Sequence, residues 1–512
     1  MKKRISISIL ASMLLFASCN ELLDLYPLDK VATSTFWKTE GDFENALTSC
    51  YGMLQQEFFA IGQIYWDAMS DDGYCQHNWY WVTNMAQGTI SPTSDGFLIT
   101  TYQMCYRSIA RSNIFLYNLK GLDGIDANKK IRWEAEARML RAYFYGFLYR
   151  CYKDLPIIKE PLDLDNQYVS ASPRAEMLSF IMDELDFCIR NLDDRTYKES
   201  GGHWTVNAAR GFKARMLLYD AYDANKNAIA SQMQEVLTVL NQISGYRLAD
   251  DYSDNFHDLQ QENCPEIMMS VKWLAPNNRN QSDLWYADWV LFSPTAGLIS
   301  LYDMADGSPG EPVPYTGRGV VDMTKFTNAS LLLRESRCDK SIFIDYYKDA
   351  DRNEYRPSNA RPLNTGVQKY LTPTLAHPYT NNSQTQHDWI IVRYADVLLM
   401  KAEAENELNG PTEVVYNAIN DIRERAGTSM LPAGLTKDEM RERIRRERRI
   451  ELAFEGHRYF DLKRWKIAKE VLNAVEDGLI VYHFEDKHYF WPIPQREIDK
   501  NNGHLVQNPD YQ

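Results

Sequence analysis

The sequence lacks several features that mark common functional classes. Beyond the N-terminal segment, no part of the 512-residue chain approaches the roughly twenty uninterrupted apolar residues of a membrane-spanning helix. It contains no HExxH metal site, phosphate-binding loop or nucleophile motif. Basic residues are in deficit, with 56 Lys and Arg against 70 Asp and Glu. The net charge of -14 repels phosphate backbones and argues against a nucleic-acid partner.

Metal-binding patterns are also missing. None of the 8 cysteines has CxxC spacing, which argues against a zinc site and against a disulfide-dense scaffold. His483 and His488, with Glu485 and Asp486, could imitate a metal site, but the following FWPIP segment favours a strand and an exposed turn. We therefore predict no metal and no cofactor. Most of the other cysteines are expected to be small core residues; they are Cys50, Cys75, Cys105, Cys151, Cys188, Cys264 and Cys338.

The N-terminus, MKKRISISILASMLLFASCN, has a basic start, an apolar run from Ile5 to Phe16 and small residues before Cys19. The apolar run is too short to cross a bilayer and is typical of an export signal over residues 1–19. Phe16-Ala17-Ser18-Cys19 resembles the lipobox of bacterial lipoproteins, in which lipids are attached to the cysteine. A multiply acylated Cys19 would hold the protein on a membrane. The alternative is an ordinary secretory signal with a chance cysteine.

Apolar residues three and four positions apart predict helices from Gly41 to about Ile243 and again near the C-terminus. The clearest pair is IVRYADVLLMKAEAENELNG with TEVVYNAINDIRERAGT, ending at Gly427. Such pairs predict an all-α fold of tetratricopeptide-like repeats, an α-α superhelix, although an irregular bundle is the alternative. Residues 246–388 lack a sustained period and are expected to form a loop-rich insert with short strands. Residues 20–245 and 389–512 would complete the same domain.

The segment RRERRIELAFEGHRYFDLKRW, residues 445–465, concentrates arginine in an acidic chain. We predict one helix from Lys437 to about Trp465, in which Glu447, Glu451 and Glu455 lie beside the apolar side. A buried carboxylate without a partner costs several kcal/mol, so arginines are expected to neutralise these glutamates inside the fold. The interleaved acids argue against a nucleic-acid surface.

This segment, followed by YFWPIPQREIDKNNGHLVQNPDY, resembles the C-terminal signature of the SusD/RagB family of outer-membrane nutrient-binding lipoproteins. Three earlier segments resemble other parts of the family's sequence. RYADVLLMKAEAENELNG with AINDIRERAG resembles the repeat that precedes this signature, and EARMLRAYFYGFLYRCYKDLPII resembles the central repeat. LLDLYPLDKVATSTFWKTEGDFENAL resembles the N-terminus. Residues from about 250 to 385 show no residue-by-residue match. The resemblance implies a surface-exposed protein, lipid-anchored through Cys19 at the cell outer membrane. It would bind oligosaccharides, or in some branches peptides, and pass them to a SusC-like TonB-dependent barrel without acting as an enzyme.

Two stretches mix tryptophan and tyrosine with acids and amides. Flat rings stack on the apolar faces of sugars while carboxylates and amides accept hydroxyl hydrogens, so glycan sites combine these residue types. The first stretch, residues 66–84, supplies the predicted ligand-binding residues Trp66, Asp71, Asp72, Asn78, Trp79, Tyr80 and Trp81. The second, residues 273–289, supplies Trp273, Asn278, Asp283, Trp285 and Tyr286. The alternative for any single ring is core packing, which we expect for Trp133, Trp465 and Trp491.

Two further functions compete with glycan binding. A peptide-binding importer subunit of the RagB type would use a concave repeat groove, and the acidic balance would favour basic peptides. A helical glycoside hydrolase needs two carboxylates about 5 to 10 Å apart. Asp71 and Asp72 are adjacent in sequence, so their side chains are expected to diverge. Glycan capture without catalysis is therefore the predicted function.

Overall fold

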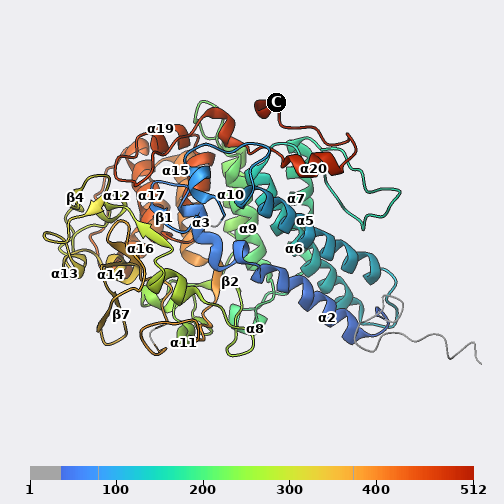
Figure 1. Ribbon diagram of the computed structural model, residues 1–512. Helices are drawn as coiled ribbons and strands as arrows, with labels where there is room; N and C mark the ends of the chain where they lie inside the picture. The colour runs from blue at the N-terminus through green and yellow to red at the C-terminus, as the bar shows by residue number, and fades with distance from the viewer. Residues whose placement is uncertain (1–35, 79, 373) are drawn as a thin grey trace, which may run out of the picture.

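The structure is a computed structural model that describes residues 36–78, 80–372 and 374–512 (Figure 1). Cys19 and the segment predicted as an export signal lie outside the described residues, as does Trp79. Helices dominate the described parts, and the strands there are short and paired in twos. The predicted all-α fold of tetratricopeptide-like helix pairs with a loop-rich insert is confirmed.

The N-terminal region is built from antiparallel helices. Its longest members, α5 (Phe97–Leu119) and α6 (Ala127–Cys151), pack together, and α6 also packs on α7 (Arg174–Asn191). α9 (Val206–Tyr219) packs on α7 and on α10 (Ala230–Leu240). The shorter elements are α2 (Glu40–Tyr51), η1 (Gly52–Gln55), η2 (Glu57–Phe59), η3 (Ile61–Gln63), α3 (Ile64–Asp67), β1 (Gly73–Cys75), α4 (Val82–Ala86) and α8 (Tyr197–Ser200).

The insert holds most of the strands, as predicted. β2 pairs antiparallel with β10 (Trp389–Arg393), β1 with β3, β4 with β5, β6 with β9, and β7 with β8. Its elements are η4 (Tyr252–Asn255), α11 (Asp258–Gln261), β2 (Ile267–Val271), η5 (Leu284–Asp288), β3 (Phe292–Pro294), α12 (Ala296–Ser300), β4 (Tyr315–Thr316), β5 (Val320–Val321), α13 (Asn328–Leu331), α14 (Ser336–Ser341), β6 (Ile342–Ile344), β7 (Tyr347–Lys348), β8 (Glu354–Tyr355) and β9 (Thr365–Val367).

The C-terminal region returns to helices. α15 (Tyr394–Asn409) packs on α10, on α16 (Glu413–Ala426) and on α17 (Lys437–Glu451). Gly427 ends α16 in the left-handed conformation with φ 70°, which confirms the predicted stop. The remaining elements are α18 (Arg458–Arg464), α19 (Ala468–Asn473), η6 (Asp486–Tyr489), α20 (Gln495–Lys500) and η7 (Pro509–Tyr511). Residues 490–494 form no strand, so the strand expected at FWPIP was wrong.

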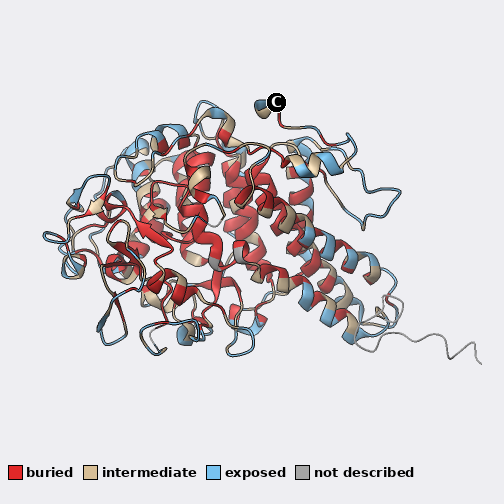
Figure 2. Ribbon diagram, viewed as in Figure 1, coloured by how far each residue is buried: buried red, intermediate tan, exposed pale blue. Residues whose placement is uncertain are grey.

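One large hydrophobic core runs from α2 to the C-terminal residues and includes parts of the insert. Buried residues fill the centre of the molecule, whereas the right-hand ends of α2, α5 and α6 and the insert loops are exposed (Figure 2). α6 lies in the middle, and a Cβ at its Gly146 would stand 2.8 Å from the Phe212 ring. Trp133, Trp465 and Trp491 are buried, as predicted. The seven described cysteines are buried and unpaired, which confirms their predicted core role.

The predicted continuous helix from Lys437 to Trp465 was wrong. α17 ends at Glu451, and the chain turns before α18 begins at Arg458. Within the turn, Phe454 has φ 67° and Gly456 has φ 76°, both in the left-handed region. The buried carboxylate of Asp67 accepts hydrogen bonds from the backbone N–H of Gly456 (2.8 Å) and of Arg458 (3.3 Å). A distant aspartate thus holds the turn, which helical spacing alone could not indicate.

The glutamates of this segment are buried and paired with cations, as predicted. Arg393 contacts Glu266 (2.6 Å), Glu451 (2.5 Å) and Glu455 (2.7 Å). Arg337 bridges Glu335 (2.6 Å), Glu447 (2.7 Å) and Glu451 (2.8 Å). Arg425 joins Glu266 (2.9 Å) to Glu451 (2.5 Å), and Lys369 binds Glu455 (2.6 Å). We call these nine side chains the arginine–glutamate network.

Burial alone would raise the pKa of Glu451, but the guanidinium groups of Arg425, Arg393 and Arg337 lower it well below its ordinary value. The glutamate therefore remains charged inside the protein. Loss of one arginine would weaken this compensation, and incompletely compensated buried charge is costly.

We expect Arg393→Ala to lower the free energy of unfolding by about 3 to 5 kcal/mol, because it leaves three buried glutamates short of a cation. Arg443→Ala, on the exposed side of α17, is the matched control and should change it by no more than about 0.5 kcal/mol. Urea unfolding followed by circular dichroism measures both. Equal small losses would contradict a structural role for the network.

Candidate ligand-binding surface

The two predicted ring-rich stretches meet in the fold. β1 follows the first stretch's acids and pairs with β3, placing Cys75 opposite Phe292. Beyond the strands, the side-chain N–H of Gln76 donates to the carbonyl of Val290 (2.8 Å). His77 Nε2 lies 3.0 Å from the carbonyl oxygen of Trp289, and the two rings are 6.3 Å apart. Residues far apart in the sequence therefore form one surface.

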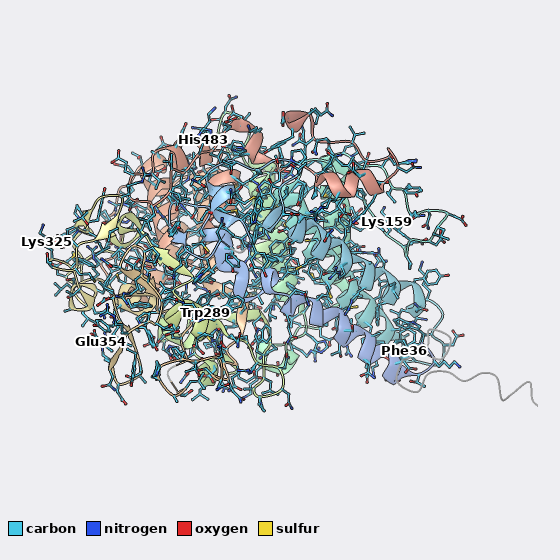
Figure 3. All side chains as sticks on the ribbon, in the orientation of Figure 1. Phe36, Lys159, Trp289, Lys325, Glu354 and His483 are labelled. Atoms are coloured by element: carbon cyan, nitrogen blue, oxygen red, sulfur yellow. The ribbon has the colours of Figure 1, made fainter. Side chains whose placement is uncertain are left out.

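We use the name ring surface for the five described aromatic side chains of residues 77–81 and 285–289 that reach solvent. Trp81 is 46% exposed, and the others are partly exposed. Figure 3 places Trp289 on the lower side of the molecule, close to the insert loops. Exposed Asn78 lies beside them and is held by Asn84, whose side-chain oxygen accepts from Asn78 Nδ2 (3.0 Å). The five are His77, Tyr80, Trp81, Trp285 and Trp289.

Both segments of the ring surface carry an unusual backbone. Trp81 has φ 57° and Val290 has φ 47°, in the left-handed region that bulky and β-branched residues rarely adopt. Neighbouring bonds hold them: the Phe97 N–H donates to the Tyr80 carbonyl (2.7 Å), and Gln76 donates to the Val290 carbonyl (2.8 Å). Such strain persists only where the surroundings enforce it and is concentrated at functional sites.

A buried group of polar side chains fixes the second segment against residues 372–388. Ser282 Oγ lies 2.7 Å from His387 Nε2, and the carboxylate of Asp283 accepts from the Thr372 N–H (2.6 Å) and from the Thr385 hydroxyl. All five residues are buried, so this serine–histidine–aspartate set has no access to substrate and serves to anchor the loop. We call it the buried clasp.

Burial dominates the protonation of the clasp. It raises the pKa of Asp283 to about 7 and lowers the pKa of His387 to about 3. The carboxyl group therefore changes charge near neutral pH, whereas the imidazole stays uncharged. Asn280 reinforces the same attachment, because its Nδ2 donates to the carbonyl of His387 (3.0 Å).

Several predicted ligand residues do not reach the surface, and these predictions are corrected. Trp66 is fully buried, stacked on Trp491 at 5.6 Å. Tyr286 is fully buried against Tyr370. Asp283 belongs to the clasp. Each side chain is buried by segments distant in sequence, so the local sequence could not indicate its burial.

Asp71 and Asp72 are likewise engaged by the protein itself. Arg458 binds Asp71 through Nε (2.8 Å), and Arg449 binds Asp71 (2.9 Å) and Asp72 (2.6 Å). Asp72 is fully buried, while Asp71 is 9% exposed and forms part of the floor of a cleft beside Tyr315. Their predicted role as sugar acceptors is therefore replaced by an ionic link between β1 and the C-terminal segment.

Trp273 and Asn278 lie at a separate hairpin tip, where Leu274 and Asn278 exchange backbone hydrogen bonds. Asn278 borders a cleft of about 250 Å³ that also contains Tyr51 and His203. The structure thus brings Tyr80, Trp81, Asn78 and Trp285 into the vicinity of the meeting point at His77 and Trp289, but it places Asn278 elsewhere. Trp79 lies outside the described residues.

Two residues of the ring surface, His77 and Trp289, belong to the predicted stretches 66–84 and 273–289. The spacing of Trp285 and Trp289 by four residues was a usable signal for one helical face. Gln76 and Ser358 gave no signal. The hydroxyl and N–H of Ser358 donate to the carboxylate of Asp288 (2.5 and 2.9 Å), which ties another insert loop beside Trp289.

Among the residues that the structure describes, no group of three or more His, Cys, Asp or Glu side chains is arranged to hold a metal ion. His483 instead lies 2.8 Å from the Glu485 carboxylate. None of the described helices is long and apolar enough to cross a membrane.

Two family models match this chain. A family model described as the SusD family matches residues 259–511, and a second, described as "Starch-binding associating with outer membrane", matches residues 23–218. The chain belongs to the SusD family. A SusD-like protein of Formosa agariphila, P25, is 27% identical over 94% of this chain and 94% of its own length. P38 of the same organism is also 27% identical, over 99% and 98%.

Solved structures share the fold over nearly the whole chain. A SusD-like protein of Bacteroides fragilis has a TM-score of 0.78 at 24% identity, covering 94% of this chain and 99% of its own. A SusD-like carbohydrate-binding protein from the same species has a TM-score of 0.74 at 22% identity, covering 93% and 100%. A laminarin-binding SusD-like protein has a TM-score of 0.69 at 22% identity, covering 92% and 99%.

The clasp makes stability depend on pH. Because the pKa of Asp283 is raised in the folded state, its contribution is fully present below its unfolded pKa of 3.8 and is lost as pH rises through about 7. We expect the stability difference between wild type and Asp283→Asn to shift against the wild type by up to about 4 kcal/mol between pH 4 and pH 8. Urea unfolding at several pH values measures it. The exposed Asp165→Asn is the control, and a pH-independent difference for Asp283→Asn would refute the assignment.

Because Trp66 and Trp81 differ in burial, replacing each of them by alanine should change the free energy of unfolding by different amounts. Trp66→Ala leaves a cavity in the core and should cost about 3 to 5 kcal/mol of unfolding free energy. Trp81→Ala removes a half-exposed ring and should cost less than about 1 kcal/mol. Thermal unfolding of the two variants checks this, and similar losses would show that the burial of one ring is misassigned.

Proposed function

We propose that this protein captures oligosaccharides on the ring surface and delivers them to a SusC-like TonB-dependent barrel in the outer membrane. The lipid-anchored Cys19 would hold it at the cell surface. The observation that carries the proposal is the meeting of two ring-rich segments at His77 and Trp289, with partly exposed tryptophans on both.

The chemistry of the surface supports sugar binding. Indole rings provide flat apolar faces, while Asn78 and His77 provide polar edges for hydroxyl groups. The strained backbone at Trp81 and Val290 presents these rings in one arrangement before a ligand arrives, which lowers the entropic cost of binding. The carbohydrate-binding and laminarin-binding relatives have the same fold and support the same ligand class.

Binding is favoured over hydrolysis by the state of the nearby carboxylates. A glycosidase needs two carboxyl groups on either side of the scissile bond. Asp71 and Asp72 are held by arginines, Asp283 lies in the clasp, and the Asp288 carboxylate binds Ser358. These four acids serve the fold. Incubation with the glycan that binds best, followed by an assay for new reducing ends, tests this, and turnover would favour the hydrolase.

Titration of an oligosaccharide panel against intrinsic tryptophan fluorescence tests the binding site. Trp285→Ala and Trp289→Ala should each weaken binding of the best glycan by about 2 kcal/mol, roughly thirtyfold, without unfolding the protein. The wild-type dissociation constant should lie between about 1 μM and 1 mM. Unchanged affinity in both variants would refute the ring surface as the site.

Trp273→Ala is the matched control, since Trp273 is a partly buried tryptophan on the hairpin tip instead of the ring surface. We expect it to leave affinity unchanged, and a selective loss there would move the site to the cleft beside Asn278 and His203. A panel of acidic and basic peptides completes the experiment. Quenching by peptides alone would favour the RagB-type function.

A further inference from the structure

Two adjoining clefts lie at the end of the molecule that carries Lys159, away from Trp289 in Figure 3. One, which we call the basic cleft, has a volume of about 220 Å³. The other, the apolar cleft, has a volume of about 430 Å³. They share Asn113, Glu160 and Pro161, so they form one continuous depression between α5, α6 and residues 156–169.

The wall of both clefts is fixed in place. The Tyr106 hydroxyl donates to the Pro156 carbonyl (2.9 Å), and Asn113 Nδ2 donates to the Ile158 carbonyl (2.9 Å). Arg141 Nη1 donates to the Lys159 carbonyl (3.1 Å). Three side chains from α5 and α6 thus hold residues 156–159, which line both clefts. These hydrogen bonds fix one wall of the depression through contacts within the protein.

Cations exceed carboxylates around the basic cleft, although the whole chain is acidic. Arg141 and Arg138 are balanced by the buried Glu184 and by Glu134, and Lys120 lies 3.5 Å from Glu160. Two lysines remain. Lys130 Nζ donates to the carbonyls of Lys120 (3.3 Å) and Leu122 (2.6 Å). Exposed Lys159 forms no ion pair with a carboxylate in the described parts of the chain.

The apolar cleft has the size of a small-molecule site and a mainly apolar lining, with the charged Glu160, Glu497 and Lys500 also on its wall. Its volume falls within the range of small-molecule pockets, roughly 300 to 1,000 Å³. Tyr102 and Ile109 lie at its base, and its rim exposes Ile114 (42%), Leu162 (44%) and Tyr168 (42%). Large hydrophobic side chains left in solvent around one depression are typical of a binding surface.

We propose that the joined clefts bind a single anionic amphiphile, with its acidic head in the basic cleft and its hydrocarbon chain in the apolar cleft. The unbalanced charge of Lys130 and Lys159 selects the head, and the area buried by Tyr102, Ile109 and Leu162 retains the chain. Asp163 and Asp165 are exposed on the adjoining loop but line neither cleft, and they would repel an extended anionic membrane. One inserted molecule therefore fits better than a lipid surface.

The chain from residue 20, which contains every described element, is titrated calorimetrically with decyl phosphate below its micelle concentration. We expect saturable binding at one site. Decanol should bind at least about tenfold more weakly because it lacks the charged head, and inorganic phosphate should give no measurable heat because it lacks the chain. Equal affinity for decanol and decyl phosphate would overturn the proposed role of the lysines.

Variants separate this site from the ring surface. Ala110→Trp adds a ring to an exposed position that lines the apolar cleft and should abolish decyl phosphate binding. Ala230→Trp, on the exposed start of α10, is the matched control and should change nothing. Lys159→Glu should weaken binding at least about tenfold. Unchanged affinity in Ala110→Trp would refute the site. Stronger binding to vesicles of phosphatidylglycerol than to decyl phosphate would favour a membrane surface over one molecule.

Oligosaccharide affinity is measured on the same Ala110→Trp and Lys159→Glu proteins and should equal that of the wild type. The amphiphile site does not rest on the proposed glycan function, and either can fail alone. Loss of both activities in Ala110→Trp would indicate a misfolded variant, in which case Lys159→Glu alone decides.

Discussion

Charge neutralisation in the interior fixes the relation between the insert and the C-terminal helices. Glu266 and Arg337 come from the insert, Arg393 from β10, and Glu451 from α17, yet all meet within the arginine–glutamate network. Each carboxylate is costly to bury and is tolerated because forked guanidinium groups satisfy several oxygens at once. A lysine could not bridge three acids in this way.

The same charges reach the ligand-binding surface. Arg449 lies on α17 between the network residues Glu447 and Glu451, and it binds Asp72. Arg458, which follows Glu455, binds Asp71, and both aspartates come immediately before β1. β1 pairs with β3 and leads directly to His77. The position of the rings is therefore set in part by cations almost four hundred residues later in the sequence. The buried clasp positions the second segment of the ring surface, since it attaches the residues before Trp285 to residues 372–388.

Sequence reasoning correctly predicted the features that depend on nearby residues. Helical spacing gave the long helices, Gly427 gave a helix end, and the cost of burying Glu451 predicted its cations. It could not tell that Trp66 is buried and Trp81 exposed, because both lie in the same ring-rich stretch. Trp66 is buried by Trp491 and Phe460, and that contact exists only after folding. The prediction that Asp71 binds ligand was wrong for the same reason, because its arginine partners are distant in sequence. The turn at Gly456, in contrast, had a local signal in its glycine.

The network also has a consequence for how the chain acquires its fold. Synthesis proceeds from the N-terminus, so Arg337 and Arg393 emerge well before Glu447, Glu451 and Glu455. Until those acids arrive, a compact intermediate would have to enclose unmatched positive charge, which favours leaving the insert open to water. A product truncated after Ile450 would keep that defect permanently. Stable folding therefore requires the final segment, and prematurely terminated copies should remain unfolded and be degraded.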